Sequence, residues 1–141
     1  MEEKYYQLSE DKKRTIKKIL KEKIEVILGL QFAYLHGSFL KADKFRDIDL
    51  AFYLDIIPPS VIEFELRLEV DFNEIIHYPV DVRILNNAPL SFRYNVIKYG
   101  EAIVVMNDDL RAEFEEIAVI NYLDFAYFRK MYLKEVLGVG I

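Results

Sequence analysis

The sequence contains no cysteine and only two histidines, His36 and His77. Without cysteine the chain can form neither a disulfide nor a thiolate metal site. With so few histidines, a zinc site would have to be built mainly from carboxylates, so we do not expect one.

Basic residues and long apolar runs are also few. The chain has 19 Lys and Arg against 24 Asp and Glu, a formal net charge of −5 at pH 7. This balance argues against broad nucleic-acid binding, which needs a basic surface, but leaves room for a local basic nucleotide pocket. No apolar run reaches the roughly 18 residues of a membrane span, and the charged N-terminus lacks a signal-peptide core. We therefore expect a cytoplasmic protein without a membrane segment.

The 141 residues, 52% of them hydrophobic, are enough for one compact domain over 1–141. Apolar periodicity, capping residues and turn signals predict an alternating order of helices and strands. The expected elements are a helix over 9–29, strands over 31–36 and 47–54, a helix over 61–76, a strand over 80–85, a helix over 89–100, a strand over 101–106 and a helix over 108–137. We expect an α/β (α+β) fold with a small mixed β-sheet and helices packed on one face.

The stretch HGSFLKADKFRDIDLAFYLD, residues 36–55, places two carboxylates at the head of a strand. In a strand, residues two apart point to the same face, so Asp47 and Asp49 project together. Asp81 has the same arrangement on the strand over 80–85. If the two strands are neighbours, three carboxylates converge, and their repulsion favours a bound cation. Mg²⁺ prefers oxygen ligands, and paired ions serve phosphoryl and nucleotidyl transfer.

The Gly-Ser turn supplies features that suit a phosphate. Gly37 lets the backbone approach a ligand closely, and Ser38 offers a hydroxyl and an N–H group. A helix that starts there would favour a phosphate at its N-terminus. Lys41 and Arg46 are close enough in sequence to neutralise a triphosphate. A plainer interpretation also fits these residues, with Asp-x-Asp at a solvated strand end and Asp81 paired with Arg83 or Lys41. For His36, beside the turn, we expect a structural role.

Gly37-Ser38, Asp47-Ile48-Asp49 and Asp81 together resemble the signature of the DNA polymerase β-like nucleotidyltransferase superfamily, and the short chain is similar to its minimal (MNT) group. The resemblance covers essentially the whole chain and implies the polymerase β-like nucleotidyltransferase fold. In two respects the chain departs from the family pattern. Only eight residues separate Ser38 from Asp47, where the family has about ten. Arg46 and Phe39 stand where relatives often carry Ser and Arg.

The resemblance implies nucleotidyl transfer from ATP with two Mg²⁺ ions. Asp47 and Asp49 would bind both ions, Asp81 would bind the catalytic one and help to deprotonate the acceptor hydroxyl, and Gly37 and Ser38 would grip the triphosphate. Proteins of this group are often antitoxins beside a HEPN-domain ribonuclease toxin and resemble enzymes that AMPylate a tyrosine of that toxin.

Three functions remain open: a protein-modifying antitoxin, a weak or inactive binding module that neutralises a toxin by occlusion, and a transferase acting on a small molecule such as an aminoglycoside. The third usually needs an added acceptor-binding domain. The last helix carries more aromatic residues than one core face needs, which indicates a protein complex or a homo-oligomer. These residues are Tyr122, Phe125, Tyr127, Phe128, Met131 and Tyr132.

Overall fold

The computed structural model describes residues 4–138 of the chain. Its elements in chain order are β1 (Tyr6–Gln7), α1 (Glu10–Glu25), β2 (Leu30–His36), α2 (Ser38–Lys41), β3 (Lys44–Phe45), β4 (Ile48–Leu54), α3 (Val61–Ile76), β5 (Val80–Ile84), α4 (Leu90–Tyr99), β6 (Glu101–Val105) and α5 (Asp108–Leu137). The long elements follow the predicted order. The short strands β1 and β3, which pair with each other, were not predicted from the sequence.

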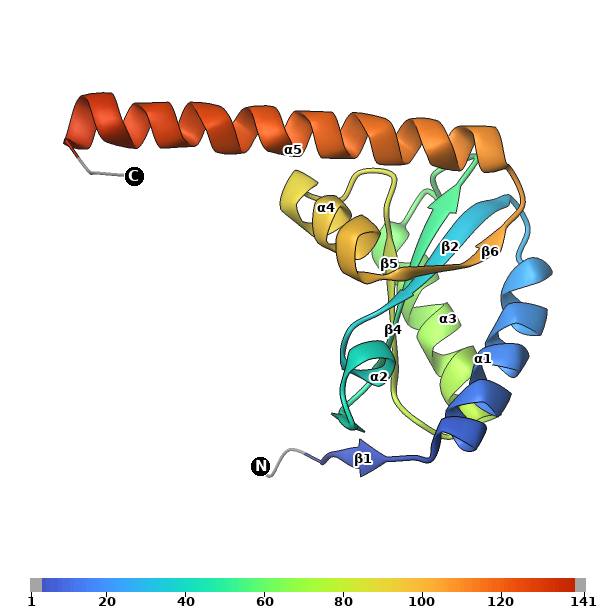
Figure 1. The fold of residues 1–141 in the computed structure, drawn as a ribbon. Helices are drawn as coiled ribbons and strands as arrows, with labels where there is room; N and C mark the ends of the chain where they lie inside the picture. Colours follow the sequence, from blue (N-terminus) through green and yellow to red (C-terminus); the bar gives the residue numbers. More distant parts are fainter. Residues whose placement is uncertain (1–3, 139–141) are drawn as a thin grey trace.

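The main sheet has four strands in the order β5-β4-β2-β6 (Figure 1). β2 pairs antiparallel with β4 and with β6, whereas β4 and β5 are parallel. The sheet is therefore mixed, as predicted, and β5 and β6 are its edges. The parallel pair places the starts of β4 and β5 side by side, which brings the predicted carboxylates to one end of the sheet.

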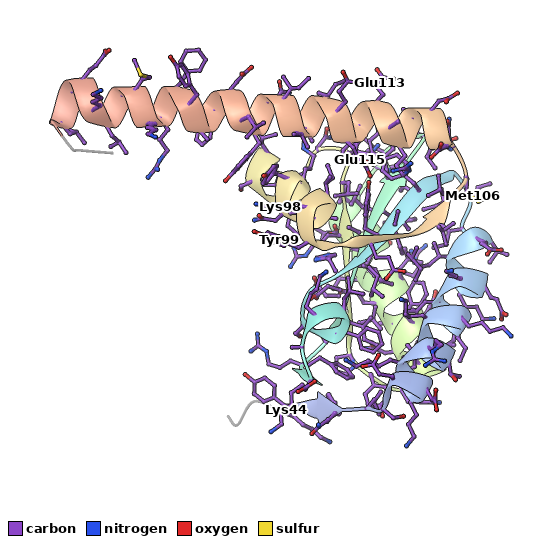
Figure 2. The ribbon with its side chains drawn as sticks, viewed as in Figure 1. Lys44, Lys98, Tyr99, Met106, Glu113 and Glu115 are labelled. Atoms are coloured by element: carbon purple, nitrogen blue, oxygen red, sulfur yellow. The ribbon has the colours of Figure 1, made fainter. Side chains whose placement is uncertain are left out.

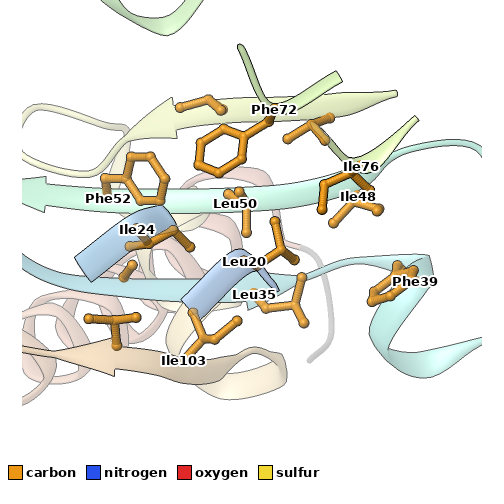
Figure 3. Packing of buried hydrophobic residues seen from close by; sticks show 14 of the residues in the cluster. Leu20, Ile24, Leu35, Phe39, Ile48, Leu50, Phe52, Phe72, Ile76 and Ile103 are labelled. Carbon is orange, nitrogen blue, oxygen red and sulfur yellow. The ribbon is translucent and has the colours of Figure 1, made fainter. Parts of the chain in front are cut away.

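The helices cover both faces of this sheet, so the prediction that they pack on one face was wrong. One apolar cluster joins α1 and α3 to the sheet through residues such as Leu20, Leu50 and Phe72 (Figure 3). A smaller cluster on the other face joins the sheet to α4 and α5 and contains Phe32, Tyr34, Ala51, Leu85, Val96 and Phe114. The alternation of β2 explains the second layer, because its large apolar side chains point to both faces.

The helix ends follow the capping chemistry that the sequence indicates. Ser9, Ser60 and Asn107 each accept a hydrogen bond from the backbone N–H three residues on. His77 ends α3 in the left-handed region at φ 67°. Helix α1, by contrast, ends at Glu25 rather than continuing to residue 29.

Helix α5 lies over the second face of the sheet and then extends past α4, away from the sheet (Figure 1). Near its start, the hydroxyl of buried Tyr34 donates a hydrogen bond to Glu115. Figure 2 shows Glu115 on the side of α5 that faces the sheet and Glu113 on the opposite side. Further along, Tyr122 stacks on Tyr94 of α4 at a centroid distance of 3.9 Å. Beyond this contact every residue up to Gly138 is exposed except Leu133, which is half-buried.

Within residues 4–138, no helix combines the length and the apolar character that crossing a membrane would require.

Candidate functional site

Three polar residues lie in one row across neighbouring strands. His36 of β2 pairs in register with Asp49 of β4, which pairs in register with Asp81 of β5. Neighbouring strands lie about 4.8 Å apart, so the row spans roughly 10 Å. Side chains alternate between the faces, and the residues flanking the two aspartates belong to the α1–α3 core, among them Ile48 and Val82. The carboxylates therefore project from the other face, as the alternation predicted.

Gly37 follows directly after this row and packs against the carboxylate of Asp49. Its φ is 81°, a left-handed conformation that favours glycine, and a Cβ at this position would overlap Asp49 Oδ2. Ser38 is the first residue of α2, where helix N–H groups have no intrahelical partner. The structure thus brings the predicted Gly-Ser turn and the predicted Asp-x-Asp together.

Lys13 supports the site although it was not predicted from the sequence. It is 8% exposed, and its Nζ donates to the backbone oxygens of Phe39 and Ala42, both at 2.9 Å. These two bonds fasten α2 to α1 and so fix the Gly-Ser turn. A signal was present in the sequence, because Lys13 continues the apolar stripe of Ile16 and Leu20 at helical spacing. A cation on such a stripe has to find partners inside the fold.

The carboxylates repel one another. Burial, followed by the charge of Asp47, a side-chain hydrogen bond with Asp47 and the charge of Asp81, raises the pKa of the Asp49 carboxyl from 3.8 to about 7, while nearby Arg46 opposes the shift. Three acids are held together without enough positive charge to balance them. This imbalance is the electrostatic condition under which a divalent cation binds favourably.

Asp81 has partners of its own in this structure. Arg83 Nε lies 3.4 Å from Asp81 Oδ2, which is the pairing that the plainer interpretation anticipated. Glu69 of α3 also forms a side-chain hydrogen bond with Asp81, and burial raises the pKa of the Glu69 carboxyl. Asp81 thus lies in the row but faces two competing partners.

Helix α3 protects the outer edge of β5. The backbone N–H groups of Val80, Val82 and Ile84 donate to three side-chain acceptors at 2.7–2.9 Å. The acceptors are Asn73 Oδ1, Glu69 Oε2 and Glu65 Oε2, spaced four residues apart on one face of the helix. These donors of the edge strand are therefore already paired and cannot hydrogen-bond another strand.

His36 contacts Phe92 of α4 edge to face, with ring centroids 5.6 Å apart. Burial lowers the pKa of the imidazole, against the opposing charges of Asp81 and Asp47, so His36 is neutral at neutral pH. Its Nε2 is buried without a hydrogen-bond partner among the described residues. The packing against Phe92 agrees with a structural role, whereas the buried Nε2 leaves a polar atom available beside Asp49.

The other two predicted nucleotide-binding residues lie on the surface. Lys41 is the exposed last residue of α2, and Arg46 is exposed just before Asp47. Arg46 acts electrostatically on Asp49, as its effect on the pKa of that carboxyl shows. Both residues thus lie on the segment that joins the Gly-Ser turn to the carboxylates.

The chemistry of the donor set fits Mg²⁺, although the side chains are not arranged around an ion. Within residues 4–138, no group of three or more His, Asp or Glu side chains is placed to hold a metal. Asp47 and Asp49 are in contact, and Asp81 would have to exchange Arg83 for the ion. All three are carboxylates, the ligands that a hard cation prefers. The raised pKa of Asp49 reflects burial and the repulsion of its neighbours, which such a cation would offset.

A cavity of about 510 Å³ adjoins the row at Asp81. It follows the outer edge of β5 between the start of α3 and the start of α4. Its lining residues are Ile57, Val61, Glu65, Asp81, Arg83, Ile84, Asn86, Asn87, Ala88, Pro89 and Phe92. Asn86 has a structural role, because its side-chain amide accepts a hydrogen bond from the backbone N–H of Leu54 and donates one to the Leu54 carbonyl. No pattern in the sequence predicts this cavity, because its lining comes from separate elements.

The family model "Polymerase beta, Nucleotidyltransferase" matches residues 14–109. The match covers more than half of the 141 residues, so the chain belongs to the polymerase β nucleotidyltransferase family. It includes the Gly-Ser turn and all three aspartates. No protein of curated function is significantly similar to the chain in sequence.

Several solved structures share the fold. One is the complex of a tri-AMPylated Shewanella oneidensis HEPN toxin with an MNT antitoxin, matched with a TM-score of 0.68 at 20% identity over 89% of this chain and 98% of the other. Another is a toxin–antitoxin structure with AMP-PNP, matched with a TM-score of 0.66 at 20% identity over 92% and 99%. A third is a MntA–HepT variant in which two aspartates are replaced by glutamate, with a TM-score of 0.69 at 20% identity over 86% and 98%. At these identities the likeness establishes the fold.

Proposed function

We propose that the protein is a Mg²⁺-dependent nucleotidyltransferase that moves AMP from ATP to a tyrosine hydroxyl of a HEPN-domain toxin and so acts as an antitoxin. The observation that carries the proposal is the row of Asp49 and Asp81 across paired strands, with Gly37 packed on Asp49. Membership of the nucleotidyltransferase family supports the reaction class. The AMPylated toxin and the AMP-PNP of the two structural neighbours support the substrate and the partner.

Each site residue then has a defined task. Gly37 and Ser38 would bind the β- and γ-phosphates through backbone N–H groups and the Ser38 hydroxyl, with Lys41 and Arg46 supplying positive charge. Asp47 and Asp49 would hold two Mg²⁺ ions, with Asp81 sharing one, and the bound ions would supply positive charge to the phosphate oxygens.

The transfer is a displacement at the α-phosphorus of ATP. A bond forms between the acceptor oxygen and the α-phosphorus while the bond to the oxygen that bridges to the β-phosphate breaks. Pyrophosphate leaves with that electron pair, and a carboxylate oxygen of Asp81 takes the acceptor proton before it passes to solvent. Lys13 touches no substrate in this account but positions α2, and with it the phosphate-binding turn.

The exposed end of α5 is our candidate for the surface that binds the toxin. Phe125, Phe128, Tyr132 and Val136 form a stripe at helical spacing, here called the α5 stripe, and their exposed fractions are 59%, 67%, 57% and 60%. Large apolar side chains that remain this exposed are typical of a protein interface. Of the six aromatic and methionine residues singled out in the sequence, Tyr122 packs on α4, whereas Phe125 and Phe128 do not reach the core.

A second candidate function is toxin neutralisation by occlusion, without chemistry. The pairing of Asp81 with Arg83 favours it, because an engaged Asp81 is not free to bind a metal. The small-molecule transferase is not supported by any comparable observation.

One assay separates the two candidates. The protein is incubated with ATP labelled at the α-phosphate, Mg²⁺ and a HEPN-domain protein encoded beside it. We expect label on the HEPN protein, lost in Asp49→Asn and kept in Asp71→Asn, a control on the exposed side of α3 away from the α5 stripe. If toxin activity is suppressed equally by the wild type and by the Asp47→Asn/Asp49→Asn variant, and no label is transferred, occlusion is the function.

A further inference from the structure

We propose that the cavity beside Asp81 binds the phenol ring of the acceptor tyrosine and so restricts transfer to aromatic hydroxyl groups. The inference rests on the proposed function and adds to it the site and the chemistry of acceptor recognition. Three observations carry it: the position of the cavity along the reaction line, the apolar character of its lining, and the capped edge of β5.

The position of the cavity follows from the geometry of the displacement. In an in-line reaction the attacking oxygen approaches opposite to the leaving pyrophosphate. The pyrophosphate would lie at Gly37-Ser38, which follow His36 and pack on Asp49 on the β2 side of the row, and Asp81 is at the β5 end of the row. The attacking oxygen therefore approaches from the β5 edge, where the cavity adjoins Asp81. The 5′-oxygen of the nucleoside is equatorial at the α-phosphorus, so the nucleoside is attached to one side of this line.

The lining selects the kind of acceptor. The larger part of the cavity wall is apolar and comes from Ile57, Val61, Ile84, Ala88, Pro89 and Phe92, while its polar groups come from Glu65, Asp81, Arg83, Asn86 and Asn87. Two of the polar side chains are already engaged, Asn86 with the backbone of Leu54 and Glu65 with the N–H of Ile84, so a sugar or other polyol would leave several of its hydroxyl groups unpaired here. A serine or threonine hydroxyl lies too near its own backbone to cross an apolar cavity and meet Asp81. A tyrosine places an apolar ring against Phe92 and carries its hydroxyl at the far end.

The capped edge of β5 limits how a polypeptide can dock here. A peptide cannot add as a strand to the β5 donors, because Glu65, Glu69 and Asn73 already accept from its outward N–H groups. Recognition at this edge therefore depends on a side chain that enters the cavity. The volume of about 510 Å³ lies within the range of small-ligand pockets and exceeds the needs of one ring, which leaves space for neighbouring residues of the acceptor.

Binding is tested directly with N-acetyltyrosinamide as the probe and N-acetylthreoninamide as the aliphatic comparison, by amide chemical shifts of the intact chain. We expect tyrosinamide to shift the signals of cavity residues such as Val61, Ile84 and Ala88, and threoninamide to bind at least tenfold more weakly. Ala88→Trp, which fills the cavity, should abolish these shifts. Ala112→Trp adds the same volume on the exposed side of α5 and should leave them unchanged.

Transfer is tested with labelled ATP, Mg²⁺ and the same two probes. Ala88→Trp should lower label transfer to tyrosinamide at least tenfold while its affinity for ATP stays within twofold of the wild type. Phe92→Leu keeps an apolar side chain but removes the ring, and it replaces Ala88→Trp in this test if that variant does not fold. We expect Phe92→Leu to lower label transfer to tyrosinamide several-fold. A folded cavity variant that binds and labels tyrosinamide like the wild type would overturn the inference.

The two proposals fail in different ways. A wild-type protein that binds tyrosinamide in the cavity but neither binds ATP nor transfers label would refute the nucleotidyltransferase function while leaving the phenol site. A wild-type protein that labels tyrosinamide without shifts at the cavity residues would refute the phenol site while leaving the transferase.

Discussion

Replacing Asp49 by asparagine should stabilise the metal-free protein at pH 8. Burial and the neighbouring acids raise the pKa of the Asp49 carboxyl from 3.8 to about 7. Between these two values the folded state binds more protons than the unfolded state. The free energy of unfolding therefore falls as the pH rises from about 4 to 7, and stays lowered above that range. Asparagine has the same shape without the charge, so this loss disappears in the variant.

The size of the effect follows from the shift. A shift of about 3 units at about 1.4 kcal/mol per unit corresponds to about 4 kcal/mol. The site is partly open to solvent, which screens the charges, so we halve this figure to about 2 kcal/mol. For a chain of this length, such a gain raises the melting temperature by about 5–8 °C.

The assay is thermal unfolding of the wild type and Asp49→Asn at pH 5 and pH 8, in a chelator. Asp49→Asn should raise the melting temperature strongly at pH 8 and only slightly at pH 5. Asp124→Asn, on the exposed part of α5, should leave the melting temperature unchanged at both pH values. An Asp49→Asn protein that is no more stable than the wild type at pH 8 would refute the claim that the acids are held together against their repulsion.

Three further predictions concern the turn, its support and the partner surface. Lys13→Met removes two hydrogen bonds from a charged donor, so we expect the free energy of unfolding in urea to fall by about 2–4 kcal/mol and ATP to bind more weakly. Unchanged ATP affinity would show that α2 keeps its position without Lys13. Gly37→Ala introduces a Cβ that overlaps Asp49 in a left-handed conformation, and should lower ATP affinity at least tenfold by calorimetry, whereas wild-type affinity would contradict the assigned phosphate turn. Phe128→Ser lies in the α5 stripe and should change the free energy of unfolding by less than about 0.5 kcal/mol while weakening HEPN-protein binding at least tenfold; equal binding would exclude this stripe as the interface.

The sequence predicts those parts of the site that depend on alternation along single strands. The period of two in residues 47–54 and 80–85 assigns Asp49 and Asp81 to the face opposite Ile48 and Val82, and the structure agrees. The sequence did not determine whether the strands of Asp49 and Asp81 are neighbours, because strand pairing depends on contacts between distant parts of the chain. The structure shows that they pair. Capping residues likewise predict where α3 and α5 start, because a cap is a local interaction.

The remaining features arise from contacts between distant parts of the chain. Lys13 reaches Phe39 and Ala42, which are 26 and 29 residues away. Only the unusual position of Lys13 on an apolar stripe hinted at such a contact. The placement of helices on both faces depended on which side of the sheet each connection crosses, and periodicity does not determine that choice. The cavity is formed by the meeting of α3, β5 and α4, and no single segment carries its pattern.

The most direct test of the account is the number of divalent cations bound in the presence of AMP-PNP. Mn²⁺ serves as a spectroscopic substitute for Mg²⁺, and its binding is counted by electron paramagnetic resonance at fixed nucleotide concentration. We predict two ions per chain, both lost in Asp47→Asn/Asp49→Asn, one lost in Asp81→Asn, and both retained in Asp124→Asn. If no Mn²⁺ binds with the nucleotide, or if the same number of ions binds to the wild type and to all three variants, the carboxylate row is not a metal site.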